Sequence, residues 1–265
     1  RHTRYPLVTG VQTCALPICT PLALHLARVL PAHAGFGSGT QLALAVGRAF
    51  AALHGLDLAT PALGHWLGRG LRSGIGIAGF DQGGLIVDGG PGPDGSPAPV
   101  LARLALPEAW RVIVVQQAGG QGLSGETEGQ SMARLEPMAQ AEAAEICHQV
   151  LMRVLPGAAS GDFAPFAAGL NRIQALLGRH FAPAQGGSAW TSAAVGRLLE
   201  GLRGLNGNAA IGQSSWGPTG FAIVPSERVA RSLLDDVAEL GTPRLQVRVV
   251  APRNRGAAVV EHALG

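Results

Sequence analysis

Apolar residues recur along this chain with the spacing of short helices separated by turns. Between Gln41 and Leu53 they lie on one helical face, and His54-Gly55 follows as a stop signal. The same spacing marks residues 21–30, ahead of a loop that runs to Thr40. Further helices are expected at residues 61–67, 139–154, 165–177, 190–205 and 226–240, the last of them capped by Ser226.

Short runs of β-branched and apolar residues predict four strands among these helices. The runs cover residues 84–88, 112–115, 221–224 and 245–250. A turn-rich segment separates the first two runs, and a polar stretch from Gly119 to Gln130 suits an inter-domain connection. Helices and strands mixed in this order indicate an α+β fold rather than a doubly wound parallel sheet.

The first nineteen residues differ from everything that follows. They hold the one tyrosine and two of the three cysteines, and from Val8 to Ile18 they read like a translated sequencing-library adapter. A secretion signal fits less well, because polar residues interrupt the apolar run and no small-x-small cleavage site follows. We therefore expect residues 1–19 to be an artefact, residues 20–120 to be a first domain truncated at its start, and residues 121–265 to be a second domain.

This division predicts two features of the structure. An unrelated leading segment should make little packed contact with the rest of the chain. A domain that lacks its first strands should show an open sheet edge or exposed apolar surface in the half before Gln117, and should aggregate readily.

The net charge of the chain is too close to zero to indicate binding to nucleic acid. The net charge is +3, and leaving out Arg1 and Arg4 lowers it by two, to +1. All twenty basic residues are arginine, which excludes a Schiff-base or P-loop lysine in this sequence. With Cys147 as the one cysteine after residue 19 and no apolar run of about 18 residues, we expect a cytoplasmic protein without disulfides or membrane contact. The oligomeric state stays open, with a homodimer among the alternatives.

A glycine-rich loop leads straight into the first long helix. Glycines let the backbone approach an oxyanion, hydroxyls add donors, and the helix N-terminus adds partial positive charge. His33, inside the loop, could donate as well, or could simply face solvent. The alternative reading is a tight turn capped by Thr40. The candidate phosphate-binding residues here are Gly35, Gly37, Ser38, Gly39 and Thr40.

A second motif runs from Arg69 to Gly84 and carries the nearest charged groups. Arg69 and Arg72 could clamp a carboxylate or phosphate bidentately, or could be solvated helix-end residues. Asp81 and Asp88 could reach Mg²⁺, or could cap turns. Of these four we take Arg72 and Asp81 as the catalytic candidates; the metal ligands are left unassigned.

A third motif precedes the expected strand at residues 221–224. It is a Ser/Gly/Pro loop, and taken alone it reads as a turn entering a strand. Trp216 within it could stack on an aromatic acid or anchor the loop. Its candidate phosphate-binding residues are Gly212, Ser214, Ser215, Gly217 and Thr219.

Taken together, these motifs resemble those of the GHMP kinase superfamily, which comprises two-domain α+β enzymes such as galactokinase and homoserine, mevalonate and phosphomevalonate kinases. The segment Ser73-Gly-Ile-Gly76-Ile-Ala78 resembles the mevalonate kinase segment Ser-Gly-Val-Asp-Asn-Ala, but Gly76 stands in place of the catalytic Asp. A glycine cannot accept a proton. With the late Arg253-Asn-Arg-Gly256, the set is similar to that of the β-ribofuranosylaminobenzene 5′-phosphate synthase family, over Thr20 to Gly265.

That resemblance implies a transferase that joins phosphoribosyl diphosphate to 4-hydroxybenzoate or 4-aminobenzoate. Diphosphate and CO₂ would leave, with Mg²⁺ neutralising charge, in a step towards tetrahydromethanopterin. It also implies that the loops 35–40 and 212–219 face one another across one cleft, with Arg72 or Asp81 on its rim. An ATP-dependent small-molecule kinase of the same fold is the alternative, and a chain without enzymatic role is a third.

Overall fold

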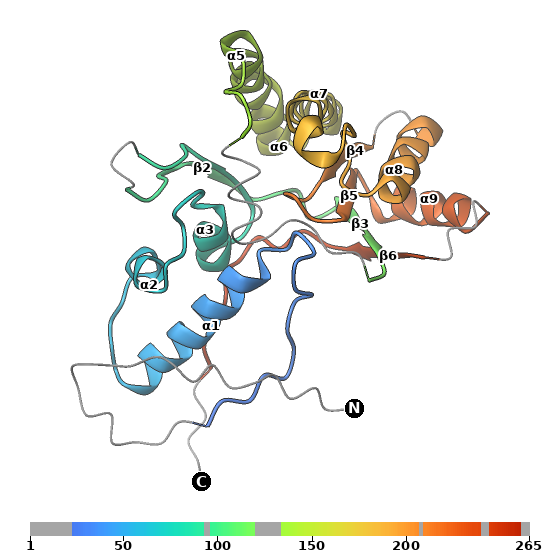
Figure 1. Ribbon diagram of the computed structural model, residues 1–265. Helices are drawn as coiled ribbons and strands as arrows, with labels where there is room; N and C mark the ends of the chain where they lie inside the picture. The colour runs from blue at the N-terminus through green and yellow to red at the C-terminus, as the bar shows by residue number, and fades with distance from the viewer. Residues whose placement is uncertain (1–22, 93–95, 120–133, 207–208, 240–243, 261–265) are drawn as a thin grey trace.

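The computed structural model describes residues 23–92, 96–119, 134–206, 209–239 and 244–260. Figure 1 shows the helices α1 to α3 on one side and the helices α5 to α9, with a four-stranded sheet, on the other. The expected lack of packing by residues 1–19, and most of the expected connection at residues 119–130, lie outside the described residues.

Three helices and a hairpin form the first half. The elements are α1 (Ser38–Leu53), α2 (Thr60–Trp66), α3 (Ile75–Gln82), β1 (Leu85–Asp88) and β2 (Val100–Leu104). Buried side chains from all three helices meet in a small core of Leu44, Leu63, Ile77 and Phe80. The predicted helices at 41–53 and 61–67 and the strand at 84–88 are confirmed, whereas α3 and β2 were not predicted.

The apolar spacing at residues 21–30 does not produce a helix. Residues 23–30 form neither helix nor strand, and Leu24, Leu26 and Val29 are exposed. An amphipathic helix of this length depends on a surface that covers its apolar stripe, and here the stripe is exposed. The helix prediction is wrong at this place for that reason.

Large apolar side chains are exposed in the first half, and to a similar degree in the second, where Leu151 is 61% and Met152 is 64% exposed. Trp66 on α2 is 69% exposed, Leu101 on β2 is 66% exposed, and Leu71 in the loop before α3 is 61% exposed. These three side chains lie on different segments of the first half.

The second half is built on an antiparallel sheet with the strand order β4-β5-β3-β6. Three of its strands, predicted at residues 112–115, 221–224 and 245–250, and all predicted helices after residue 130 are confirmed, while the short edge strand β4 was not predicted. The predicted helix at 139–154 continues through a π-helical turn (Val150–Val154) into α6. The elements are β3 (Arg111–Gln117), α5 (Gln140–Gln149), α6 (Leu155–Ser160), α7 (Phe163–Phe181), a 3₁₀ turn (Ala182–Gln185), α8 (Ala193–Asn206), β4 (Ala210–Gln213), β5 (Thr219–Val224), α9 (Glu227–Glu239) and β6 (Leu245–Val250).

Alternate residues of the sheet face two different layers of helices, as the period of a strand requires. Ile113 on β3 and Ala222 on β5 pack with buried residues of α8 and α9. Ile223, the next residue of β5, packs with Phe166 and its neighbours on α7. The strands β4 and β5 are therefore buried on both faces, whereas alternate residues of the edge strand β6 are exposed.

Two links join the halves across the predicted division at residue 120. The strand β3 precedes that residue, yet it pairs with β5 and β6 at the centre of the second half's sheet. The segment after β6 returns to the first half, where the Asn254 side chain donates to Leu106 O and accepts from Leu106 N, each at 2.8 Å. The late Arg253–Gly256 motif thus ties the C-terminal segment to the first half.

Candidate functional site

The N-terminus of α1 has the electrostatic features of an anion-binding position. Gly37 precedes it in the left-handed region with φ 62°, no side chain caps the helix, and its first turn holds no acidic residue. The first hydrogen bond of the helix runs from Gln41 N to Gly37 O at 3.0 Å. The amides of Ser38, Gly39 and Thr40 therefore have no intrahelical partner and lie at the positive end of the helix dipole.

The loop before α1 packs backbone to backbone against the third motif. The Ser214 hydroxyl donates to Gly35 O at 2.8 Å, across 179 residues of sequence. A Cβ atom on Gly217 would lie 2.4 Å from Gly35 N, and one on Gly35, where φ is 88°, would lie 2.3 Å from Ser214 O. Only glycines permit this approach, so the structure brings the two loops together.

The second motif reaches the same helix start. A Cβ atom on Gly39 would lie 3.7 Å from Arg69 Nη1, and Gln41 Nε2 donates to Gly76 O at 2.8 Å. Arg69 makes no hydrogen bond or ion pair within the described part of the chain. A guanidinium beside the positive end of a helix is unfavourable alone and favourable with an anion between them. The positive end of the α1 dipole and the Arg69 guanidinium would therefore both be stabilised by an anionic ligand between them.

Of the two catalytic candidates, Asp81 has its hydrogen-bond partner away from the loops. Asp81 Oδ1 accepts from Thr60 Oγ1 at 2.6 Å, and Thr60 in turn accepts from Arg48 Nη2 at 2.7 Å. Five residues of helix turn the Asp81 side chain about 140° away from Gly76, which is the residue next to Thr40. Arg72 is exposed in the turn before α3 and has an interaction of its own. Their catalytic roles stay predictions, and for Asp81 this placement is unfavourable.

Asp88 serves as a cap, the second of the two roles considered for it. Its Oδ2 accepts from Ser73 Oγ and Gly74 N, both at 2.7 Å, and from Ile75 N at 3.2 Å. Because these are the donors that open α3, this carboxylate fixes the start of the helix that carries Gly76.

We expect Asp88→Ala to lower the free energy of unfolding by about 1–2 kcal/mol, the usual loss for a helix cap. The measurement is urea unfolding followed by circular dichroism, with Asp57→Ala as control, since Asp57 is exposed. An equal loss in both variants would mean that the three hydrogen bonds contribute nothing specific.

The third motif is divided between two surfaces. Gly212 lies buried within β4, where a Cβ atom would meet Phe221 and Gln174, and Thr219 lies buried at the start of β5. Ser214 and Gly217 face the loop before α1. Ser215, exposed and with φ 55°, instead lines a separate pocket. Of the five predicted residues, the structure brings Ser214 and Gly217 into contact with that loop.

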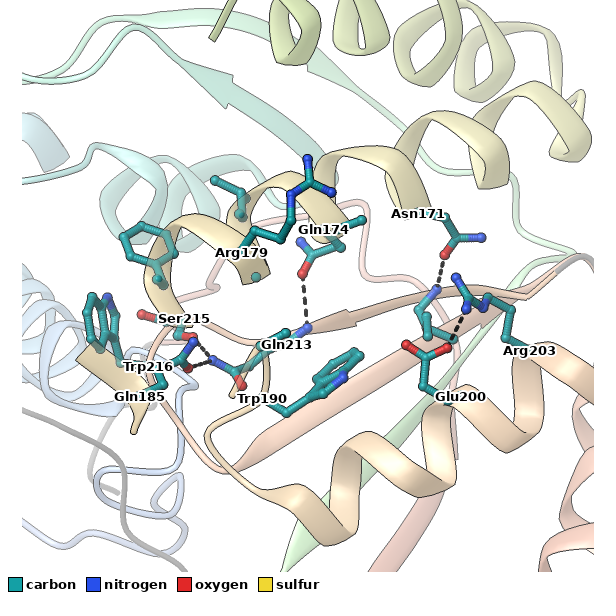
Figure 2. Close-up of a pocket in the computed structure, with 16 residues that line it drawn as sticks. Asn171, Gln174, Arg179, Gln185, Trp190, Glu200, Arg203, Gln213, Ser215 and Trp216 are labelled. Atoms are coloured by element: carbon teal, nitrogen blue, oxygen red, sulfur yellow. Dashed lines mark hydrogen bonds and ion pairs between the residues drawn. The ribbon is translucent and has the colours of Figure 1, made fainter. Parts of the chain in front are cut away.

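This pocket has a volume of about 590 Å³ and lies along β4, between α7 and α8 (Figure 2). We call it the α7–α8 groove. Figure 2 shows Trp216 and Ser215 at one end, Trp190 near the middle, and Glu200 with Arg203 at the other. Nothing in the sequence pattern indicated it, because its walls come from segments that only the fold brings together.

Metal ligands are not clustered in the described part of the chain. No group of three or more His, Cys, Asp or Glu side chains that could hold a metal occurs there. Asp81 and Asp88, the carboxylates considered for Mg²⁺, are engaged by Thr60 and by the start of α3. The described residues therefore do not fit a resident Mg²⁺ site made by their side chains alone. No helix of the described residues is long and apolar enough to cross a membrane.

Comparison with known proteins finds relatives over most of the chain. The GHMP kinases N-terminal domain matches residues 7–84, and the GHMP kinases C-terminal domain matches residues 154–242. The chain is 39% identical over 239 residues to beta-ribofuranosylphenol 5′-phosphate synthase of Archaeoglobus fulgidus, covering 85% of this chain and 72% of the relative. The protein of the same name from Methanothermobacter thermautotrophicus is 31% identical over 245 residues, covering 88% and 72%.

Solved structures agree on the fold. Homoserine kinase from Cytophaga hutchinsonii superposes with a TM-score of 0.60 at 16% identity, covering 86% of this chain and 69% of that one. Phosphomevalonate kinase from Streptococcus pneumoniae gives 0.61 at 13% identity, covering 83% and 71%. At such identities the likeness shows the fold alone, which confirms the predicted α+β GHMP-type architecture.

Proposed function

The chain belongs to the beta-ribofuranosylphenol 5′-phosphate synthase family within the GHMP superfamily, and from this we propose that it is a pentosyltransferase acting on phosphoribosyl diphosphate and 4-hydroxybenzoate. The relatives' name describes a phenol carrying a ribosyl 5′-phosphate, which favours the hydroxybenzoate over the aminobenzoate. The reaction would be one step in the biosynthesis of tetrahydromethanopterin. We keep a cytoplasmic location as part of the proposal; a homodimer stays an open alternative.

The observation that carries the proposal is the positive, uncapped start of α1 with Arg69 beside it. Backbone amides of residues 38–40, the Ser38 and Thr40 hydroxyls and the Arg69 guanidinium would hold the diphosphate group. These donors favour the departing diphosphate more than the intact ester, because negative charge grows on it as the bond to ribose C1′ breaks. Mg²⁺ belongs to the proposal as a companion of the diphosphate, held by phosphate oxygens and water.

The chemistry balances without a protein base. The ring carbon that bears the carboxylate attacks ribose C1′, and diphosphate leaves with the electron pair of the C1′–O bond. The new C–C bond leaves the ring electron-deficient, and the pair of the ring–carboxylate bond restores its aromaticity as CO₂ departs. No proton moves, so glycine at position 76 is compatible with the reaction.

A kinase of the same fold is the alternative, and position 76 weighs against it. Gly76 lies next to Thr40, where a Cβ atom would come within 3.1 Å of Thr40 Cγ2. Because glycine has no side chain, position 76 provides no group to orient an acceptor hydroxyl, which is the task that a kinase base performs.

The two functions are separated by their products. We expect the chain to release diphosphate from phosphoribosyl diphosphate only when 4-hydroxybenzoate is present, and to make no ADP from ATP with homoserine or mevalonate. Formation of ADP at ordinary kinase rates of about 1–100 per second would favour the alternative instead.

We expect Ser38→Ala to raise the KM for phosphoribosyl diphosphate about tenfold. The lost hydrogen bond to a charged oxygen corresponds to about 1.5 kcal/mol, and the Ser38 hydroxyl has no other partner within the described residues. Initial rates at varied substrate test this, with Ser232→Ala on the exposed surface of α9 as control. An unchanged KM would remove Ser38 from the diphosphate site.

A further inference from the structure

The late Arg-Asn-Arg-Gly motif lies in a segment that leaves β6 and binds the end of α3. Residues 251–257 form neither helix nor strand, and we call them the C-terminal strap. Gly84 N donates to Arg253 O at 2.8 Å, and Ala257 N donates to Phe80 O at 2.7 Å. The strap is therefore bound to the first half through its backbone.

Glycines allow the strap to lie directly on the last turn of α3. A Cβ atom on Gly256 would overlap with Asp81 O. One on Gly83, where φ is 61°, would lie 2.6 Å from Arg253 O and from Arg255 O. Backbone atoms cannot rotate out of the way as side chains can, so the strap and the end of the helix fix one another's position.

Arg103 on β2 binds the end of α3 and the strap with the same guanidinium. Its Nε donates to Gly83 O and its Nη2 to Gln82 O, both at 3.1 Å, and Nη2 also donates to Asn254 O. Carbonyl groups at the end of a helix lack intrahelical partners and carry partial negative charge, so a guanidinium there is favourable. One side chain thus joins β2, α3 and the strap.

The opposite end of α3 reaches the proposed diphosphate site. Gly76 O accepts from Gln41 Nε2 at 2.8 Å. Gly76 also packs on Thr40, whose Cγ2 would lie 3.1 Å from an added Cβ atom. Four residues separate Gly76 from Phe80, which is about 6 Å along a helix axis. The strap therefore acts about one helical turn away from the residue that supports Thr40.

A helix as short as α3 takes its position from the groups that hold it. Its eight residues fall below the length of about 12–15 at which isolated helices are marginally stable. Ile77 and Phe80 pack in the small core of the first half, Asp88 holds the start of the helix, and the strap with Arg103 holds its end. Of these supports, the strap comes from the second half, because it continues β6.

Resting on the proposed function, we propose that the strap and Arg103 position the diphosphate site. They hold α3 so that Gly76 keeps the Thr40 hydroxyl in place for the diphosphate. Arg103, Asn254 and Gly256 are then positioning residues, since they act through α3. The second half supports the site at two places, because the loop that carries Ser214 also packs on the residues before α1.

Calorimetric titration of the 265-residue chain with phosphoribosyl diphosphate, without acceptor, tests this role. We expect Gly256→Ala to weaken binding about tenfold, because the new methyl group displaces α3 and with it a hydrogen bond from Thr40 to a charged oxygen. Arg255→Ala is the matched control within the strap and should bind as the wild type does. Arg255 is exposed, and its side chain makes no hydrogen bond or ion pair within the described residues.

Arg103→Met is a second variant, which keeps the test decisive if Gly256→Ala does not fold. It keeps the alkyl stem of the side chain and leaves the backbone of the strap unaltered, but it removes the donors that join α3 to the strap. Binding of phosphoribosyl diphosphate should weaken in the same direction. Thermal melting shows which variants are folded at the temperature of the titration.

A double-mutant cycle separates positioning from a general loss of stability. If the strap acts through Thr40, Gly256→Ala or Arg103→Met should weaken binding by no more than about twofold when Thr40→Val is already present. Ser38→Ala is the comparison, because its side chain leaves α1 about 160° away from that of Thr40. In that background each strap variant should keep its full effect.

Strap variants that bind phosphoribosyl diphosphate as the wild type does would overturn the inference. Equal losses in the Thr40→Val and Ser38→Ala backgrounds would overturn it as well. In both cases, binding by the wild type and weaker binding by Ser38→Ala alone would leave the proposed function standing. A wild type that does not bind phosphoribosyl diphosphate would refute the proposed function, and the inference with it.

Discussion

Replacing Gly217 by alanine should lower kcat/KM for the transferase reaction by about a hundredfold or more, because displacement of a site by about 1 Å has effects of that size. The added Cβ would lie 2.4 Å from Gly35 N and 2.5 Å from the carbonyl carbon of Ala34. Neither backbone atom can rotate away, so the two loops must separate. The loop that holds diphosphate would then lose its support.

Gly79→Ala is the matched control for this change. Gly79 lies in α3, and a Cβ atom there has no other atom within 4 Å, so the substitution should leave activity near that of the wild type. Thermal melting of both variants shows whether the fold survives. Activity of Gly217→Ala within a few-fold of the control would mean that contact between the loops is not required.

Removing Arg69 should weaken phosphoribosyl diphosphate binding by about 2–3 kcal/mol, or roughly 30- to 150-fold. Arg69 Nη1 lies 3.7 Å from where a Cβ atom on Gly39 would be, in the first turn of α1, and lysine is absent from the whole sequence. Arg69→Lys should recover part of the affinity, since an ammonium keeps the charge and loses the bidentate geometry.

Titration calorimetry with phosphoribosyl diphosphate measures this effect, and Arg197→Ala is the control. Arg197 lies exposed on α8, outside the groove and away from α1. Raising the salt concentration should weaken binding to the wild type more than binding to Arg69→Ala, because one charge pair is gone. Equal affinity of the two variants would remove Arg69 from the site.

The fold was predictable where apolar residues repeat over a long segment. The helices α1, α7 and α9 and the strands β3 and β6 follow from periodicity, since each buries one or both faces. The helix α3 was not predicted, because Gly74, Gly76 and Gly79 interrupt the apolar periodicity that indicates a helix. Its start is fixed by Asp88, fourteen residues from Gly74, and no local pattern records such a bond.

The edge strand β4 was not predicted for a related reason. β4 has four residues, one of them Gly212, and its outer edge is completed by Asn171 and Gln174 of α7, about forty residues earlier. Propensity within β4 could not show this, because the partners that stabilise the strand are side chains rather than another strand.

The candidate site was likewise predictable only in part: local motifs indicated the loops, but not the residues whose partners come from distant elements. Motif resemblance predicted that the phosphate loop and the third motif face one another across a cleft; the structure brings them together, but in direct backbone contact. The roles of single acids were not predictable, because Asp81 and Asp88 each take their partners from another element. The α7–α8 groove left no sequence signal, since Trp190, Glu200 and Gln213 belong to three separate segments.

Release of labelled CO₂ from carboxyl-labelled 4-hydroxybenzoate is the most direct measurement of the central claim. We expect release to require phosphoribosyl diphosphate and to match diphosphate one for one, because one C–C bond forms for each carboxylate lost. Release that needs no phosphoribosyl diphosphate, or diphosphate formed without CO₂, would contradict the account.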